Sequence, residues 1–208
     1  MKNSMVFLAV SVIIAAGLWT LMFCPATAPY VNFWGMMCIS AVVLVTLTFF
    51  SEIKWWKDLM SGWKTVAAGI GLAVGLWCVF WIGDKAASWL FDFARPQVDM
   101  IYGIRSGISP VLLSFLLVFL IGPAEEIFWR GYVQRSLSDR IGKNLGYVAA
   151  TLAYAGVHVP SGNFMLVMAA LVAGAVWGLF YRLFPRKFMA LVISHALWDA
   201  AVFVWFPI

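Results

Sequence analysis

The feature that most constrains this chain is a set of long stretches without a charged residue. Residues 3–51, 65–83, 106–124 and 144–181 contain no Asp, Glu, Lys or Arg. Only 11% of the 208 residues are charged, against about 25% in a typical soluble domain. Lipid offers the backbone no hydrogen-bond partners, so long uncharged stretches cross a bilayer as helices, in which the backbone groups bond to one another. The sequence therefore predicts an all-α, polytopic membrane protein.

A helix needs roughly 20 apolar residues to cross a bilayer. On that length the sequence predicts about seven spans, near residues 5–23, 31–50, 65–82, 108–129, 144–159, 163–182 and 188–206. Residues 51–64 mix Trp with Lys, which is typical of an interfacial helix. Residues 84–107 mix charged and aromatic side chains. We interpret them as a connector on the outer surface, with a role over an active site as the alternative.

The Lys and Arg residues orient the spans, because cytoplasmic loops are enriched in them. With the N-terminus in the cytoplasm, the cytoplasmic set is Lys2, Lys54, Lys57, Lys64, Arg135, Arg140, Lys143, Arg182, Arg186 and Lys187. The opposite side receives only Lys85, Arg95 and Arg105. The net charge of +5 is then a topology signal, and no nucleic-acid partner is expected.

The first apolar run is longer than the apolar region of a signal peptide, so we interpret it as a retained span. We expect a multi-pass protein of a prokaryotic cell membrane. The three cysteines, at positions 24, 38 and 78, have neither metal nor redox spacing.

Ionisable side chains inside the predicted spans gather in the last four of them. They are Glu125, Glu126, Arg130, His158, His195 and Asp199, and they include both histidines of the chain. An ionisable group inside a membrane is costly and indicates a functional site by default. The first three spans have none, and we interpret them as scaffold.

The two adjacent acids are expected to play different parts. Glu126 and Arg130 are four residues apart, so they share a helix face and can form an ion pair. Glu125 points about 100° away from that face and lacks this partner, which leaves it available as a general base. The alternative is that both acids lie at the cytoplasmic end of the span and extend to the interface.

His158 is the expected partner of Glu125. The turn between the fourth and fifth spans is predicted near residues 140–143, and the two residues are almost equally far from it along the chain. In an antiparallel helical hairpin, equal separations from the turn put residues at the same depth. Glu125 and His158 can therefore face each other deep in the bundle.

His195 and Asp199 lie four residues apart on one face of the last predicted span. Asp199 can orient His195, or both can donate to a substrate carbonyl if Asp199 is protonated. The alternative is a polar clamp between helices. Turn counting puts His195 nearer the cytoplasmic side than His158, so a helix tilt is needed to bring the two histidines to one level.

Three motifs follow one another on predicted spans: Glu125-Glu126-x-x-x-Arg130, Tyr154-x-x-x-His158 and His195-x-x-x-Asp199. In this order they resemble the CAAX prenyl endopeptidase and bacteriocin-processing (Abi) family of intramembrane proteases. The resemblance covers residues 109–205 and adds to the interpretation of the individual residues.

The resemblance implies a role for each group. Glu125 would be the general base that activates water, and His158 would help to bind or polarise that water. Glu126 and Arg130 would hold the helix geometry.

His195 and Asp199 would stabilise the oxyanion. Two positions depart from the family pattern: Tyr154 stands where Phe is usual, and Asp199 stands where many members have Asn. An ionised Asp199 would repel an oxyanion, so it is either protonated or serves to orient His195.

These interpretations predict one membrane domain, with residues 1–107 as scaffold and residues 108–208 as catalytic core. The expected activity is hydrolysis of a peptide bond in a membrane-anchored protein or peptide, by activated water and without a cofactor. The resemblance adds C-terminal processing or sorting as a biological setting. Two alternatives stay open. One is a zinc protease with Glu125, His158 and His195 as ligands, and the other is a non-enzymatic immunity or assembly protein.

Overall fold

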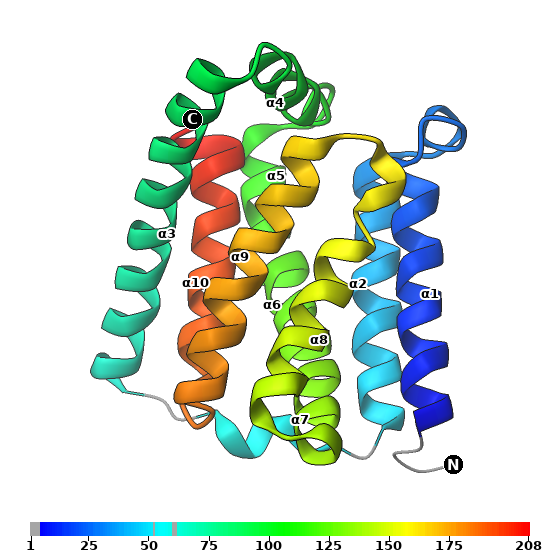
Figure 1. Cartoon of the computed structure of the whole chain (residues 1–208), viewed down its shortest axis with the longest axis vertical. Coiled ribbons are helices and arrows are strands. Elements are labelled where there is room, and N and C mark those ends of the chain that lie inside the picture. The colour runs from blue at the N-terminus through cyan, green and yellow to red at the C-terminus, as the bar shows by residue number, and fades with distance from the viewer. Residues whose placement is uncertain (1–4, 52, 60–61) are drawn as a thin grey trace.

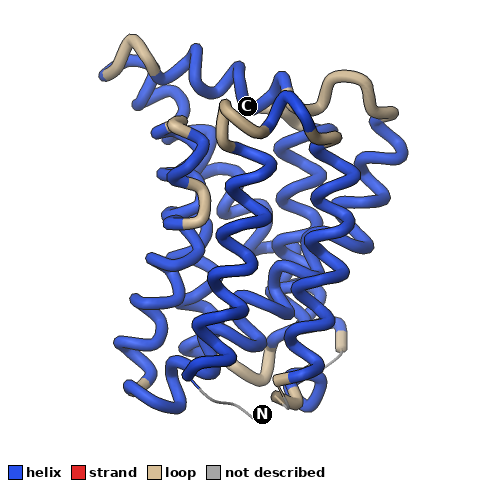
Figure 2. Tube along the Cα trace, turned by 90° about the vertical axis from the view of Figure 1, so that its right-hand side faces the viewer, coloured by secondary structure: helices blue, strands red, loops and turns tan. Residues whose placement is uncertain are grey.

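The computed structural model describes residues 5–51, 53–59 and 62–208, and Lys2 lies outside them. Its described part consists of helices and loops, and the helices run side by side along the long axis of the molecule (Figures 1 and 2). The beginning of the described chain and its C-terminal end lie at opposite ends of this bundle (Figure 1). This confirms the all-α helical fold class.

In the described part of the chain, six helices are long and apolar enough to cross a membrane. They are α1 (Met5–Phe23), α2 (Phe33–Phe50), α3 (Trp63–Leu90), the composite helix Pro110–Ile141, α9 (Phe164–Leu183) and the helix that begins with α10 (Phe188–Ala200) and ends at Trp205. Side chains of Asn32 and Asn163 cap α2 and α9 by accepting hydrogen bonds from backbone N–H groups. The protein is therefore an integral, multi-pass membrane protein.

The predicted span at residues 144–159 is a shorter helix. Helix α8 (Lys143–Gly156) has 14 residues, or about 21 Å at 1.5 Å per residue, against roughly 30 Å of hydrocarbon. A 3₁₀ turn (Val159–Ser161) follows it, and the chain then continues to α9 (Figure 1). The prediction is thus confirmed for six spans, and the seventh segment is too short to be a full one.

The composite helix carries Glu125 and Glu126 and is not a regular α-helix. It consists of α5 (Pro110–Leu116), a π-helical stretch (Leu117–Ile121), α6 (Gly122–Glu126), a second π-helical stretch (Ile127–Gln134) and α7 (Arg135–Ile141). In the first π stretch the Gly122 N–H donates to the Leu117 carbonyl, five residues back. Such π turns occur frequently at functional sites.

The turn predicted near residues 140–143 is confirmed. Helix α7 ends at Ile141 and α8 begins at Lys143. Between them Gly142 has a φ of +87°, a backbone angle that residues other than glycine rarely adopt. The chain therefore reverses over a single residue, and α7 packs against α8.

The two segments between spans differ from their predicted form. The described part of residues 51–64 contains a single 3₁₀ turn, Trp55–Asp58, where an interfacial helix is predicted; residues 52, 60 and 61 lie outside the described chain. Helix α3 continues to Leu90, past the predicted end at residue 82. Helix α4 (Ala94–Gly103) then lies across the end of the bundle opposite the N-terminus (Figure 1).

Candidate active site

A cavity of about 420 Å³ lies inside the bundle, and its walls are mostly apolar. The polar and ionisable groups among its lining residues are Asp84, Tyr102, Glu125, Tyr154, His158, His195 and Asp199. The four residues predicted to act on a substrate are thus brought to one cavity, although they come from three different segments of the chain. Glu126 and Arg130 are buried beside it.

Glu126 is the centre of a buried ionic network. Its Oε1 accepts hydrogen bonds from Arg130 Nη1 and from His195 Nδ1, both at 2.8 Å. Its side chain is 0% exposed and that of Arg130 is 3% exposed. The predicted ion pair is present, and it offsets the cost of placing both charges away from water. The contact with His195 could not be predicted from sequence spacing.

His195 is held on three sides. Its ring stacks on Trp177 with centroids 3.9 Å apart and planes 18° apart, while Nδ1 contacts Glu126. Its Nε2 lies 3.4 Å from Asp199 Oδ2. Asp199 therefore lies where it can orient His195, which is one of its two predicted roles. The neighbouring Ser194 hydroxyl accepts a hydrogen bond from the Trp177 indole.

Glu125 is the acid at the cavity wall whose hydrogen-bond partner is a neutral group. Tyr154 donates its hydroxyl to Glu125 Oε2 at 3.1 Å. The other two acids in the lining have ionic partners: Asp84 contacts Lys85 and Arg95, and Asp199 contacts His195. Of the three, Glu125 is therefore the acid suited to accept a proton.

His158 is fixed by hydrogen bonds at both ring nitrogens. Its Nδ1 lies 2.9 Å from the Tyr154 carbonyl oxygen, to which it can only donate. Its Nε2 accepts from the indole N–H of Trp19 at 3.1 Å. These two contacts define one neutral tautomer of the ring.

Glu125 lies about one helical turn away from the level of His158, at which it was predicted to lie. Its direct partner across the hairpin is Tyr154, four residues before His158 in α8. The π-helical stretch Ile127–Gln134 explains the shift, because a π turn contains more residues than an α turn. The segment from Glu125 to the hairpin turn is therefore shorter than an α-helix with the same number of residues.

Buried tryptophans form part of the site. Although tryptophan in a membrane protein is typically an interface anchor, five of the 12 Trp residues are buried: Trp19, Trp34, Trp129, Trp177 and Trp198. Two of them contact the predicted histidines. A tryptophan in an apolar segment gives no sequence signal that separates these roles, since both place it in a hydrophobic surrounding.

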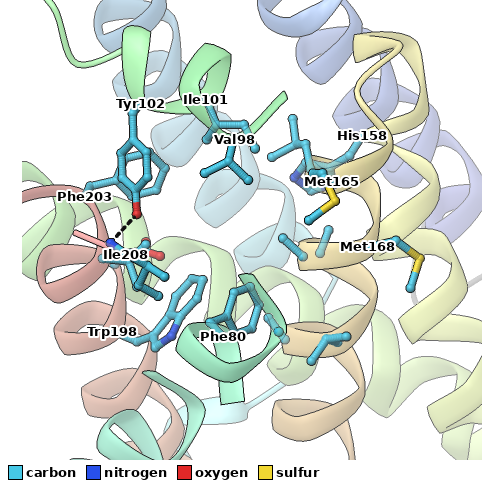
Figure 3. A pocket seen from close by; sticks show the side chains of 18 of the residues that line it. Phe80, Val98, Ile101, Tyr102, His158, Met165, Met168, Trp198, Phe203 and Ile208 are labelled. Carbon is cyan, nitrogen blue, oxygen red and sulfur yellow. Dashed lines mark hydrogen bonds between the residues drawn. The ribbon is translucent and has the colours of Figure 1, made fainter. Parts of the chain in front are cut away.

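Helix α4 closes one end of the cavity. Its Val98 and Ile101 side chains point into the space from one side, and Trp198 and Phe80 bound it from the opposite side (Figure 3). Burial raises the pKa of Tyr102 in this helix, so its hydroxyl keeps its proton and accepts from the Ile208 backbone N–H (Figure 3). Residues of the segment 84–107, which is predicted as a connector, therefore line the cavity.

A zinc ion in a protein requires three or four ligands with free lone pairs. Within the described residues, no group of three His, Cys, Asp or Glu side chains is arranged to hold a metal. Both ring nitrogens of His158 are already engaged. The residues named as ligands in the zinc alternative therefore do not form a ligand set in this arrangement.

Residues 107–201 match the family model described as type II CAAX prenyl endopeptidase Rce1-like. Comparison with curated proteins and with solved structures gave no match. All three motifs lie inside the matched range and, from separate helices, meet at or beside one cavity. Residues 107–201 of the chain therefore match the type II CAAX prenyl endopeptidase family, which is a family of intramembrane proteases.

Proposed function

We propose that the protein is a glutamate-dependent endopeptidase that hydrolyses a peptide bond of a membrane-anchored protein or peptide. The observation that carries the proposal is the position of Glu125. It lies at the wall of an apolar cavity beside His195 and Asp199, and its hydrogen-bond partner is a neutral hydroxyl. An apolar wall suits a substrate segment that is itself embedded in lipid.

In the proposed reaction Glu125 takes a proton from water, and the resulting hydroxide attacks the scissile carbonyl carbon. A C–O bond forms and the carbonyl oxygen becomes an oxyanion, which His195 stabilises from the cavity wall. The C–N bond then breaks, and the proton held by Glu125 passes to the departing amine. Water is consumed and no group outside the chain is required.

Asp199 and Glu126 act on His195 in this scheme. Because Glu126 holds Nδ1, the ring presents Nε2 to Asp199 and to the cavity. Asp199 serves to orient that nitrogen, a role that avoids placing a negative charge against the oxyanion. His158 forms part of the cavity wall near Glu125, and hydrogen bonds at both ring nitrogens hold its imidazole in place.

The substrate and the membrane orientation belong to the same proposal. The matched family model is named for prenyl endopeptidases, so a prenylated C-terminal peptide is one candidate substrate. A C-terminal sorting anchor is the other. We propose that the protein lies in a prokaryotic cell membrane. We place its N-terminus in the cytoplasm, because ten of the 14 Lys and Arg residues are then on the cytoplasmic side.

The test is cleavage by purified protein in liposomes, with a farnesylated CAAX peptide and a single-span protein with a sorting anchor as probes. We expect one probe to be cut, and Glu125→Gln to lower kcat by roughly 100- to 10,000-fold, the range of a lost general base. A folded Glu125→Gln variant with wild-type turnover would overturn the proposal.

A chelator arm tests metal dependence. We expect 1,10-phenanthroline to leave the rate unchanged in protein prepared without added zinc. Inhibition that added zinc reverses would favour the metalloprotease. A Glu125→Gln variant that keeps its full effect in cells would instead favour a non-enzymatic immunity or assembly role.

A further inference from the structure

Tyr154 contacts several groups of the site at once. Its hydroxyl donates to Glu125 Oε2 at 3.1 Å, and its backbone carbonyl oxygen lies 2.9 Å from His158 Nδ1. Its ring also lies under the Arg130 guanidinium, 4.6 Å from the ring centroid. One residue of α8 thus connects the proposed base, the first histidine and the buried ionic network.

The ring of Tyr154 is fixed by its packing. Trp129 contacts it at a centroid distance of 5.3 Å and an interplanar angle of 72°. On another side, a Cβ added at Gly174 would lie 2.9 Å from Tyr154 Cδ1, so α9 approaches the ring as closely as a glycine allows. The hydroxyl therefore has one position, and that position is within hydrogen-bond distance of Glu125.

This hydroxyl is the part of Tyr154 that packing alone does not explain. A phenylalanine would keep the aromatic contacts with Trp129 and Arg130 and would bury no polar atom. A buried hydroxyl stays favourable only when it is hydrogen-bonded, and Glu125 supplies the acceptor. Tyr154 is only 6% exposed, and its hydrogen bond to the proposed base is therefore what makes a buried hydroxyl favourable at this position.

The bond restricts a flexible acid. A glutamate side chain has three rotatable bonds, and in an apolar cavity it has few other partners. With Oε2 held by Tyr154, the carboxyl plane is fixed, and Oε1 is left to accept a proton. Fixing a reacting group before substrate arrives lowers the barrier of the chemical step.

We propose that Tyr154 is a positioning residue of the peptidase reaction, whose hydroxyl fixes the Glu125 carboxyl group for proton transfer. The inference rests on the proposed role of Glu125 and goes beyond it. It assigns a function to an atom that a phenylalanine at this place would lack. It also predicts that the hydroxyl and the ring of Tyr154 have separable effects.

The experiment compares three variants in the cleavage assay. Tyr154→Phe removes only the hydroxyl, Tyr154→Leu removes the ring as well, and Tyr132→Phe removes the hydroxyl of a tyrosine that is also buried but does not line the cavity. We expect Tyr154→Phe to lower kcat about 10- to 100-fold, the effect of one hydrogen bond to a charged group, with KM and thermal stability unchanged.

A purely structural tyrosine gives the opposite pattern. Tyr154→Phe would then match wild type in kcat, and only Tyr154→Leu would be damaged; that result would overturn the inference. Labelling by a hydrophobic carbodiimide supplies a readout that does not depend on turnover. We expect the labelling rate of Glu125 to change in Tyr154→Phe and to stay at the wild-type value in Tyr132→Phe.

The two proposals fail in distinguishable ways. If Glu125→Gln keeps full turnover, the glutamate mechanism is wrong and Tyr154 has no base to position. If Glu125→Gln is inactive while Tyr154→Phe has wild-type kcat and wild-type labelling, the mechanism stands and only the positioning role is wrong.

Discussion

The indole N–H of Trp19 donates to Nε2 of His158 across 139 positions of sequence, at a distance of 3.1 Å. Trp19 belongs to α1, which lies outside the residues matched by the family model. Its ring also meets the His158 ring edge-on, with centroids 6.1 Å apart. The N-terminal half of the chain thus supplies a direct hydrogen-bond partner to His158, one of the residues predicted to act on a substrate.

Trp19→Phe should therefore lower activity, although Trp19 lies outside residues 107–201, which match the family model. The change leaves His158 Nε2 as a buried acceptor without its donor, which costs about 1–3 kcal/mol, and we expect lower thermal stability together with lower kcat. Trp205→Phe is the matched control, because it removes an indole hydrogen bond to Ser114 at an exposed position. Equal effects of the two changes on kcat would contradict the prediction.

Glu126→Gln should destabilise the protein strongly. Arg130 is 3% exposed at its side chain, and removal of the Glu126 charge leaves this cation buried without its ion-pair partner. Breaking a buried pair in this way costs about 3–5 kcal/mol, which thermal or denaturant unfolding in detergent can measure. A drop in kcat should accompany it, since His195 loses the negative charge that faces its Nδ1.

The control for that change is Asp99→Asn, which breaks an ion pair with Arg95 at the exposed end of the bundle. Exposed pairs contribute about 0–1 kcal/mol, so stability should hardly change. Similar losses for the two variants would show that burial does not govern the Glu126 pair.

Gly122→Ala should separate the two helices that carry the acids and His195. A Cβ at Gly122 would lie 2.9 Å from the Ala196 Cα and 3.0 Å from its backbone nitrogen, and backbone atoms cannot move aside as a side chain can. We expect a loss of roughly 1–3 kcal/mol from overpacking and a fall in kcat. Gly75→Ala in α3 meets no atom within 4 Å and should be neutral or stabilising.

Ile101→Trp should narrow the cavity beneath α4. Ile101 lines the cavity, whereas Met100 next to it is 65% exposed. The larger side chain should raise KM severalfold with little change in kcat, because it removes space for the substrate without touching Glu125. Met100→Trp adds the same bulk on the outer face of the helix and should leave both constants at their wild-type values.

The sequence was most informative where the bilayer itself imposes the pattern. Helix α1 is predicted at residues 5–23 and observed at Met5–Phe23, because an uncharged stretch can only be a span. The span predicted at residues 65–82 ends before Asp84, the first charged residue after an uncharged stretch, whereas helix α3 continues beyond it. Asp84 is buried and contacts Lys85 and Arg95, and this pairing allows the helix to continue to Leu90.

Within the site, contacts along one helix could be predicted and contacts between helices could not. The spacing of Glu126 and Arg130 defines their pair wherever the helix lies. The contact of Glu126 with His195 depends on how two helices pack, and the partner of Glu125 depends on an irregular turn. Single-sequence periodicity assumes 3.6 residues per turn throughout, so it places Glu125 one turn from its actual level.

Because π-helical stretches lie on either side of Glu125, the direction in which the two acids point depends on the number of residues in those stretches. Each π turn holds about one residue more than an α turn, and one residue corresponds to about 100° of rotation about the axis. Deleting one residue within Leu117–Ile121 would permit a regular α-helix from Pro110 to Glu126 with the same apolar character. The span would still insert in a membrane, but its acids would be turned relative to the lipid-facing residues that precede them. The direction of the acids in this helix therefore depends on the number of residues in the preceding π-helical stretch, and a hydropathy profile would not reveal a one-residue change there.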